Sequence, residues 1–231
     1  MSIAENIVQV RANIAQACRD AGRDVSEITL VGASKMNDAA ACREAIAGGI
    51  DALGENRVQE MTQKLSENAY EGAPLHFIGH LQRNKVKQVV GKVDLIQSVG
   101  SLELLDEIEK AAAKLEIVQD ILLEVNIAGE EAKSGFAPED VFAAAETALT
   151  RPHIRVRGLM TIPPFDADRD TNIQYFGKVR ALYVDINAKL FHNELECLSM
   201  GMSGDFEDAI AEGATLVRVG TSLFGARPPM T

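Results

Sequence analysis

Lys35 is the residue whose type and position most clearly predict chemistry in this sequence. It follows an apolar run at residues 28–33 by two positions, and small residues stand directly before it. An amine that is partly desolvated at a strand end has a lowered pKa, and its neutral form can attack an aldehyde. Taken alone, a lysine at this position is more simply interpreted as a solvated side chain at the end of a strand. The choice between the two interpretations therefore depends on the other candidate residues.

Two glycine-containing segments further along the chain predict a site for a phosphate group. Residues 201–204 read Gly-Met-Ser-Gly ahead of a short predicted helix, and Gly220 and Thr221 follow the last predicted strand. Glycines let backbone N–H groups approach an anion, and the start of a helix adds partial positive charge. The alternative is that Gly204 and Asp205 simply turn the chain and cap the helix, and the two interpretations are compatible.

Strands and helices alternate along the chain that carries these residues. Apolar runs rich in β-branched residues predict eight strands, and apolar positions at helical intervals predict helices between them. The strands are expected at residues 28–33, 51–54, 75–78, 94–98, 121–126, 156–160, 195–199 and 216–219. Parallel strands joined by right-handed crossovers explain this alternation, and eight such units close into an α/β fold, the (β/α)8 or TIM barrel. The alternative is an open doubly wound sheet, which normally has fewer strands.

A first helix precedes the alternating units. Ser2 and Glu5 have the spacing of a capping box, and an apolar stripe at helical intervals follows them. We expect residues 1–22 to pack on the barrel as this N-terminal helix and residues 1–231 to form one domain. Pro138 is expected to open a helix in the position that proline prefers. The other helices are expected at residues 38–46, 56–68, 102–115, 172–190 and 205–212 and in a segment that ends at residue 89.

The candidate site residues share one position in this pattern, just past the end of a strand. In a barrel of this class, chemistry takes place at the carboxyl ends of the strands, in the loops that follow them. Lys35, Asn56 and Ser203 follow the first, second and seventh predicted strands, and Arg218 leads out of the eighth towards Gly220. We therefore expect these side chains at one rim of the barrel.

The composition excludes several classes of function. The chain has 231 residues with 23 lysines and arginines against 34 aspartates and glutamates, a net charge of −11. So acidic a protein is a poor general binder of nucleic acid or of anionic membranes. No apolar run approaches the ~20 residues of a membrane helix, and three cysteines without a CxxC pair are typical of a cytoplasmic protein. Histidines and cysteines lack metal-ligand spacing, so no metal site is expected.

Several sequence segments together resemble the pyridoxal phosphate homeostasis protein family. The most specific are HFIGHLQRNK at residues 76–85, LSMGMS at 198–203 and VRVGT at 217–221. Shorter matches are Ser34-Lys35, Gly54-Glu55-Asn56 and Arg157-Gly158-Leu159-Met160, and the whole set runs in order between residues 28 and 227. Gly32-Ala33 replaces a bulkier pair and Leu75 replaces a frequent aromatic residue, but neither departure touches the proposed ligands.

The resemblance implies a fold-type-III barrel, like the N-terminal domain of alanine racemase, that holds pyridoxal 5′-phosphate (PLP) as an internal aldimine on Lys35. It implies that Ser203, Gly220 and Thr221 contact the phosphate and that Arg218 faces the pyridine nitrogen. It also implies that Asn56 lies near the cofactor. The resemblance implies that the family buffers PLP and delivers it to PLP-dependent apo-enzymes. We expect a cytoplasmic protein that is a monomer rather than an obligate oligomer. No catalytic residue is therefore expected, although weak residual PLP chemistry is compatible with this function.

Physical chemistry favours a carrier over an enzyme. An arginine beside the ring nitrogen disfavours protonation of that nitrogen, which weakens PLP as an electron sink. A racemase also needs a second acid/base group on the opposite face of the substrate. In alanine racemase, which this barrel is implied to resemble, an added β-domain and a partner subunit supply that group. This sequence ends at Thr231, shortly after the eighth strand, so we expect that group to be absent. The alternatives are a PLP-dependent amino-acid racemase and a phosphosugar-binding enzyme, which shares the phosphate site but does not need Lys35.

Overall fold

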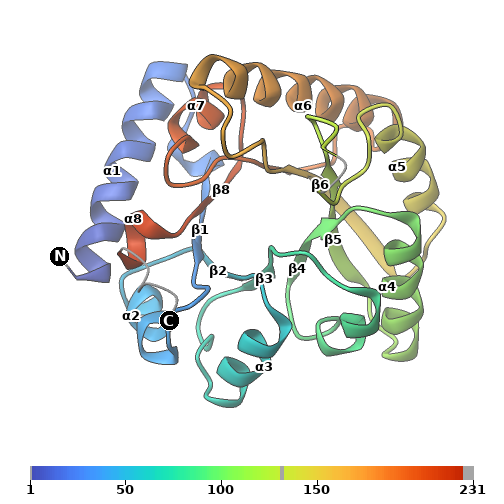
Figure 1. Cartoon of the computed structure of the whole chain (residues 1–231), viewed down its shortest axis with the longest axis horizontal. Coiled ribbons are helices and arrows are strands. Elements are labelled where there is room, and N and C mark those ends of the chain that lie inside the picture. Colours follow the sequence, from blue (N-terminus) through green and yellow to red (C-terminus); the bar gives the residue numbers. More distant parts are fainter. Residues whose placement is uncertain (1, 131–132, 226–231) are drawn as a thin grey trace.

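The computed structural model describes residues 2–130 and 133–225. Within these residues eight parallel strands form a closed barrel in which each strand pairs with the next and β8 pairs with β1 (Figure 1). The prediction of a (β/α)8 barrel is confirmed, and the open doubly wound sheet is wrong. Closure follows from the pairing of β1 with β8, which leaves no unpaired sheet edge among these strands.

The strands lie where the apolar runs predict them, with shifts of a few residues at their ends. The longest are β5 and β6, which extend beyond the predicted runs because they pair with each other there, Gln119 with Ile154 and Val125 with Thr161. Their bounds are β1 Thr29–Ala33, β2 Ala52–Glu55, β3 Leu75–Phe77, β4 Leu95–Val99, β5 Gln119–Val125, β6 Ile154–Thr161, β7 Cys197–Ser199 and β8 Leu216–Val219.

Helices follow the strands and form the outer ring of the barrel (Figure 1). Their bounds are α1 Ile3–Ala21, α2 Ala39–Ala47, α3 Val58–Ser66, α4 Leu102–Lys114, α5 Val141–Leu149, α6 Arg169–Leu190, α7 Phe206–Ala211 and α8 Thr221–Phe224, with 3-10 segments η1 Val25–Glu27 and η2 Arg83–Gln88. The helix predicted to end at residue 89 is thus a 3-10 segment, and the eighth strand is followed by a short helix that the sequence analysis did not predict.

The prediction that Pro138 opens a helix is wrong. The helix α5 begins at Val141, and Pro138 lies in the turn before it. That turn is closed by the N–H of Asp140, which donates to the carbonyl of Ala137 across 2.9 Å. Proline suits this turn for the same reason that it suits a first helical turn, since both hold φ near −65°.

The helix α1 covers the side of the barrel where its first and last strands meet. The predicted capping box is present, because Ser2 and Glu5 each accept a hydrogen bond from the other's backbone N–H. Ile7, Val10 and Ile14 are buried, and α1 packs against α2, α7 and α8. Apolar burial on one face fixes this helix to the barrel wall.

The barrel interior has an apolar lower part and a polar upper part. Its apolar residues include Leu95, Leu122 and Leu216, and the residues two positions further along the same strands are Gln97, Glu124 and Arg218. Side chains two apart in a strand point to the same face, so this second set lies one layer nearer the carboxyl ends. We call Gln97, Glu124, Arg218, His76 and Ser199, all buried, the polar layer.

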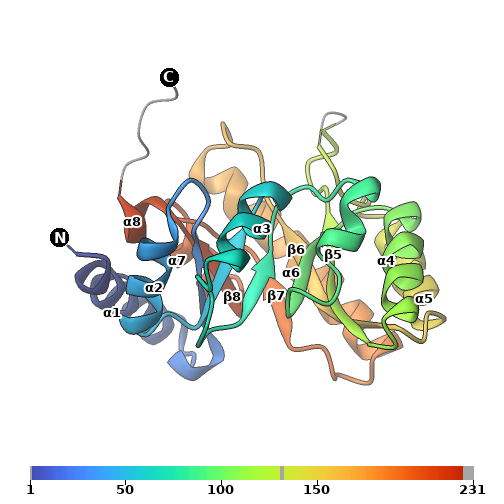
Figure 2. The same cartoon turned by 90° about the horizontal axis from the view of Figure 1, so that it is seen from below.

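Different chain segments cover the two ends of the barrel. Figure 2 shows the loops that follow β5 and β6 at the top and the connection from α6 to β7 at the bottom. The polar layer therefore forms a floor beneath the loops at the carboxyl ends of the strands. Among the described residues, none of the helices is both long enough and apolar enough to span a membrane.

Candidate functional site

Four neighbouring strands carry all the residues that the sequence analysis assigned to a site. Around the closed barrel β7, β8, β1 and β2 are consecutive, and Ser203, Arg218, Lys35 and Asn56 belong to them or to the loops that follow them. Ala33 pairs with Gly54 in the ladder between β1 and β2. Lys35 and Asn56, each two residues further on, therefore follow neighbouring strands at matching positions.

Lys35 is half-buried in the loop after β1. Its carbonyl accepts a hydrogen bond from Nδ2 of Asn37 across 3.0 Å. The residues on both sides of it are also held: the N–H of Ser34 donates to the carbonyl of Gly54 across 3.0 Å, and the N–H of Met36 donates to Oε1 of Glu60. The backbone that carries the amine is thus anchored before and after Lys35.

Arg218 is a buried cation in the polar layer, with 3% of its surface exposed. It donates through Nη1 to the hydroxyl of Ser199 and through Nη2 to the carbonyl of Thr161 across 2.9 Å. Burial lowers the pKa of Arg218 to about 10, so the guanidinium is still charged at neutral pH. In residues 2–130 and 133–225 no carboxylate oxygen forms an ion pair with it. A ligand atom that accepts a hydrogen bond suits such a group.

Hydrogen bonds run from Arg218 across the barrel to β3. The hydroxyl of Ser199 donates to Oε1 of Gln97 across 2.7 Å, and Nε2 of Gln97 lies 3.0 Å from Nδ1 of His76. Burial lowers the pKa of His76 to about 4, so its ring is neutral at pH 7 and Nδ1 can accept from the amide. The sequence analysis did not single out Ser199 or Gln97, although strand alternation places both in the barrel interior.

Two acidic side chains lie close enough to influence Arg218 without pairing with it. Burial raises the pKa of Glu124 and of Asp205, and the charge of Arg218 acts in the opposite direction on both. The second oxygen of Glu124, Oε2, accepts from the hydroxyl of Ser134 across 3.0 Å. Their negative charge in turn favours the charged form of Arg218.

The loops that follow β7 and β8 are joined by one hydrogen bond. The N–H of Gly220 donates to the hydroxyl oxygen of Ser203 across 3.1 Å. A hydroxyl that accepts one bond can still donate its own hydrogen to a ligand. Thr221 is exposed at the start of α8, next to this contact.

Asp205 does not cap α7 as the sequence pattern predicted. It occupies the position before the helix, but its side chain makes no capping bond to the helix backbone. Its Oδ1 instead accepts from the N–H of Met202 across 2.5 Å, and its Oδ2 accepts from Nδ2 of Asn172 across 3.2 Å. Asp205 therefore closes the loop of residues 201–204 with its side chain, and the prediction that this side chain simply caps the helix is wrong.

Asn56 is held by a close backbone approach. A Cβ at Gly79 would lie 2.3 Å from the carbonyl oxygen of Asn56, so only glycine fits there. The side-chain oxygen Oδ1 of Asn56 is buried and finds no hydrogen-bond donor among the described residues. A buried acceptor without a donor is costly, and a ligand that donates a hydrogen bond would satisfy it.

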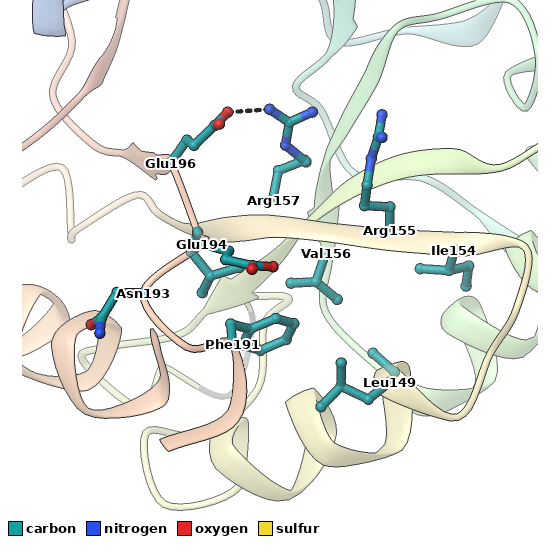
Figure 3. A pocket seen from close by; sticks show the side chains of 11 residues that line it. Leu149, Ile154, Arg155, Val156, Arg157, Phe191, Asn193, Glu194 and Glu196 are labelled. Carbon is teal, nitrogen blue, oxygen red and sulfur yellow. Dashed lines mark hydrogen bonds and ion pairs between the residues drawn. The ribbon is translucent and has the colours of Figure 1, made fainter. Parts of the chain in front are cut away.

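The described surface has cavities at both ends of the barrel. A cleft of about 980 Å³ at the carboxyl end is lined by Ser203, Gly204 and Ser222 together with residues of α1 and of the loop after β6. Figure 3 shows another cleft, of about 610 Å³, by the start of β6 and the connection from α6 to β7. Its Arg157 is paired with Glu196 and Asp120, so the charge of this guanidinium is already compensated. Only the first cleft adjoins candidate site residues.

In the part of the chain that the structure describes, no three histidine, cysteine, aspartate or glutamate side chains are grouped so that they could hold a metal ion. The spacing of histidines and cysteines in the sequence predicts no metal site.

Comparisons with known proteins agree on one family. Residues 6–228 match the family model of the alanine racemase N-terminal domain. The chain is 45% identical to a pyridoxal phosphate homeostasis protein of Aquifex aeolicus, with 98% of this chain and 99% of the relative covered. It is 44% identical to the protein of that name from Pseudomonas aeruginosa, with 98% and 96% covered.

Solved structures resemble this barrel over its whole length. PipY of Synechococcus elongatus, solved with PLP bound, superposes with a TM-score of 0.85 at 32% identity, covering 97% of this chain and all of that one. An alanine racemase of Clostridium difficile superposes with a TM-score of 0.74 at 19% identity, and the match covers 98% of this chain but 57% of the racemase. The second likeness concerns the fold alone. The chain belongs to the pyridoxal phosphate homeostasis protein family, whose barrel is that of the alanine racemase N-terminal domain.

Proposed function

We propose that this chain binds PLP covalently, through a Schiff base on Lys35, and takes part in intracellular PLP homeostasis and delivery without robust catalysis. The observation that carries the proposal is the buried, charged Arg218, which has no ion-pair partner among the described residues, on the strand between Lys35 and the Ser203–Gly220 contact. The relatives named for PLP homeostasis and the neighbour solved with PLP support the identity of the ligand.

The polar groups of the site fit the groups that PLP carries. A pyridine nitrogen is a hydrogen-bond acceptor, and the guanidinium of Arg218 is a donor only. The hydroxyl of Ser203 and the backbone N–H of Thr221 suit a phosphate, for which charge-assisted hydrogen bonds are the strongest contacts. The N–H of Gly220 holds the Ser203 hydroxyl in place beside them. The unpartnered Oδ1 of Asn56 suits a donor near the ring. These contacts bind and orient the cofactor through its ends and edges.

Lys35 supplies the covalent contact in this proposal. Its neutral amine attacks the aldehyde carbon, one C=N bond forms and one water molecule leaves. Lys35 is half-buried in the loop after β1, at the rim where the cofactor is proposed to lie. Bound PLP supplies an aldehyde that can exchange between amines, which is the chemistry that a carrier needs.

The position of Arg218 argues against robust catalysis. A permanent charge near the pyridine nitrogen opposes a second positive charge there, and an unprotonated ring stabilises a carbanion poorly. Arg218 keeps its charge at pH 7 despite burial. We therefore propose that the site holds PLP without activating it for reactions at an amino-acid α-carbon.

Delivery to PLP-dependent apo-enzymes in the cytoplasm completes the proposal. The three cysteines, Cys18, Cys42 and Cys197, are free thiols, which is typical of a reducing compartment. A carrier in that compartment shares it with enzymes that need the cofactor. A direct check is the reactivation of an apo-enzyme by the PLP-loaded protein in the presence of a scavenger of free PLP.

The covalent contact is tested by reductive trapping. Protein loaded with PLP should be yellow, and borohydride followed by peptide mapping should place the pyridoxyl group on Lys35. The variant Lys35→Ala should lose the colour and the adduct while it remains folded, because this rim residue contributes little to the core. A pyridoxyl group found on Lys85 or Lys133 instead would contradict the assignment.

A further inference from the structure

A second lysine, Lys64, is buried beneath the loop that carries Lys35. Lys64 belongs to α3 and only 4% of its surface is exposed. Its Nζ donates to the carbonyl of Ser34 across 2.8 Å and to Oε1 of Glu55 across 2.7 Å, and Oε1 of Glu60 lies 3.4 Å away. A lysine is almost never this buried unless it is paired. The site as described so far gives this buried ion pair no function.

The partners of Lys64 hold the chain on both sides of Lys35. On the side before it, the hydroxyl of Ser34 donates to Oε1 of Glu55 across 2.6 Å. On the side after it, the N–H of Met36 donates to Oε1 of Glu60. Met36 has a φ of 63°, a left-handed conformation that costs energy in a residue other than glycine and persists only where the surroundings hold it. Glu55 and Glu60, which hold the loop on the two sides of Lys35, therefore both contact the ammonium group of Lys64.

Tyr70 completes the cluster around Glu55. Its hydroxyl donates to the same oxygen, Oε1, across 3.0 Å. Burial, and then the charge of Glu55, raise the pKa of Tyr70 far above its usual range, so its hydroxyl stays a donor. Three donors, from Ser34, Lys64 and Tyr70, thus converge on one carboxylate oxygen and fix its place at the end of β2.

We propose that Lys64, held by Glu55 and Glu60, is a positioning residue for Lys35. Among the described residues its hydrogen bonds and ion pairs go to Ser34, Glu55 and Glu60, and it acts through Ser34 and Met36, the two residues that flank the reactive amine. The inference rests on the proposed function, since it concerns the lysine that bonds the aldehyde. Bond formation requires the reacting atoms in a narrow range of geometry, and a misplacement of about 1 Å can cost about 100-fold.

Two ligands separate positioning of Lys35 from general damage to the site. PLP has the aldehyde, whereas pyridoxine 5′-phosphate has the same ring and phosphate but no aldehyde, so it cannot bond to Lys35. In the variant Lys64→Met we expect the affinity for PLP to fall by about tenfold or more, while that for pyridoxine 5′-phosphate stays within about twofold. The visible band of bound PLP should weaken in parallel. Equal losses for both ligands, or no loss for either, would overturn the proposal.

A second variant keeps the proposal testable if Lys64→Met does not fold. Glu60→Gln leaves the buried pair of Lys64 and Glu55 in place, removes the longer contact of Lys64 with Glu60 and weakens the anchor at Met36. We again expect a loss confined to PLP, smaller than that of Lys64→Met, and a loss shared by both ligands contradicts the proposal.

Matched tyrosine variants provide the control. Tyr70→Phe removes a donor from Glu55, and Tyr183→Phe removes a hydroxyl that donates to the carbonyl of Leu195 at the opposite end of the barrel. Only Tyr70→Phe should weaken PLP relative to pyridoxine 5′-phosphate. Failure of the proposed function has a different signature: wild-type protein and Lys35→Ala would then bind PLP equally well.

Discussion

The N–H of Gly220 donates a hydrogen bond to the hydroxyl oxygen of Ser203 and so joins the loops that follow β8 and β7. The two residues are neighbours because β7 and β8 are paired in the barrel, through Ser199 and Leu216. This bond uses one of the two acceptor lone pairs of the hydroxyl and orients its hydrogen away from Gly220. Ser203 is therefore prepared to donate to an anion at the rim.

The variant Ser203→Ala should lose affinity for PLP but not for pyridoxal. A hydrogen bond to a charged group contributes roughly 1.5–3 kcal/mol, which corresponds to a decrease in affinity of about tenfold or more. Pyridoxal lacks the phosphate, so it should bind the variant and the wild type alike. Spectroscopic titration measures both affinities. Ser66→Ala, at an exposed serine that donates to the carbonyl of Gln63, is the matched control. Equal losses for the two ligands would show that Ser203 does not contact the phosphate.

Exchange of an amino-acid α-proton with deuterated water tests whether the protein is a carrier or an enzyme. We expect L-alanine to react slowly or weakly with PLP-loaded protein and to exchange its α-proton slowly, because in the proposed site Arg218 faces the ring nitrogen and disfavours its protonation. Proton NMR of the amino acid measures the exchange rate, with Lys35→Ala as the control. Fast exchange in the wild type that this variant abolishes would reverse the conclusion in favour of a racemase-like enzyme.

Stability should fall as the pH is lowered from about 6.5 towards 4 because of His76. Burial lowers the pKa of His76 to about 4 in the folded protein, against 6.5 for an ordinary histidine. Between these values the unfolded state binds a proton that the folded state does not, so acid favours unfolding in that window. The contribution is about 2 kcal/mol between pH 7 and pH 5.

Urea unfolding at pH 7 and pH 5 measures this effect. In His76→Gln the difference in unfolding free energy between the two pH values should shrink by about that 2 kcal/mol. His192→Gln changes an exposed histidine and should leave the difference as it is in the wild type. If His76→Gln kept the full pH dependence, other groups would account for it.

Gly158 in β6 should not tolerate a side chain. A Cβ at this position would lie 1.7 Å from the carbonyl oxygen of Cys197, and its φ is 154°. The ladder between β5 and β6 also shifts its register here, since Ile121 pairs with Val156 and Leu122 with Gly158. We expect Gly158→Ala to destabilise the protein by more than about 3 kcal/mol or to prevent folding, because two strands would have to separate. Thermal unfolding measures it, and Gly204→Ala, with no atom within 4 Å of the added Cβ, should change stability little.

The sequence by itself determined the barrel and the rim on which the candidate site lies. Alternating apolar runs and helical periods predicted the eight strands, because each period reflects a local backbone geometry that the nearby residues impose. The same pattern placed Lys35, Asn56 and Ser203 just past strand ends. Local patterns gave a wrong prediction for Asp205. Its side chain accepts a hydrogen bond from the N–H of Met202 and makes no capping bond to α7.

Only the tertiary structure decided which buried polar groups meet. Ser199 contacts Gln97, which is 102 residues away, and Lys64 contacts Ser34, which is 30 residues away. Strand alternation indicates that such side chains face a common interior, but their partners depend on how the strands are staggered when the barrel closes. The stagger is a property of the whole sheet, so the hydrogen bonds around Arg218 and the cluster of Lys64 follow from the closed barrel and not from any single segment.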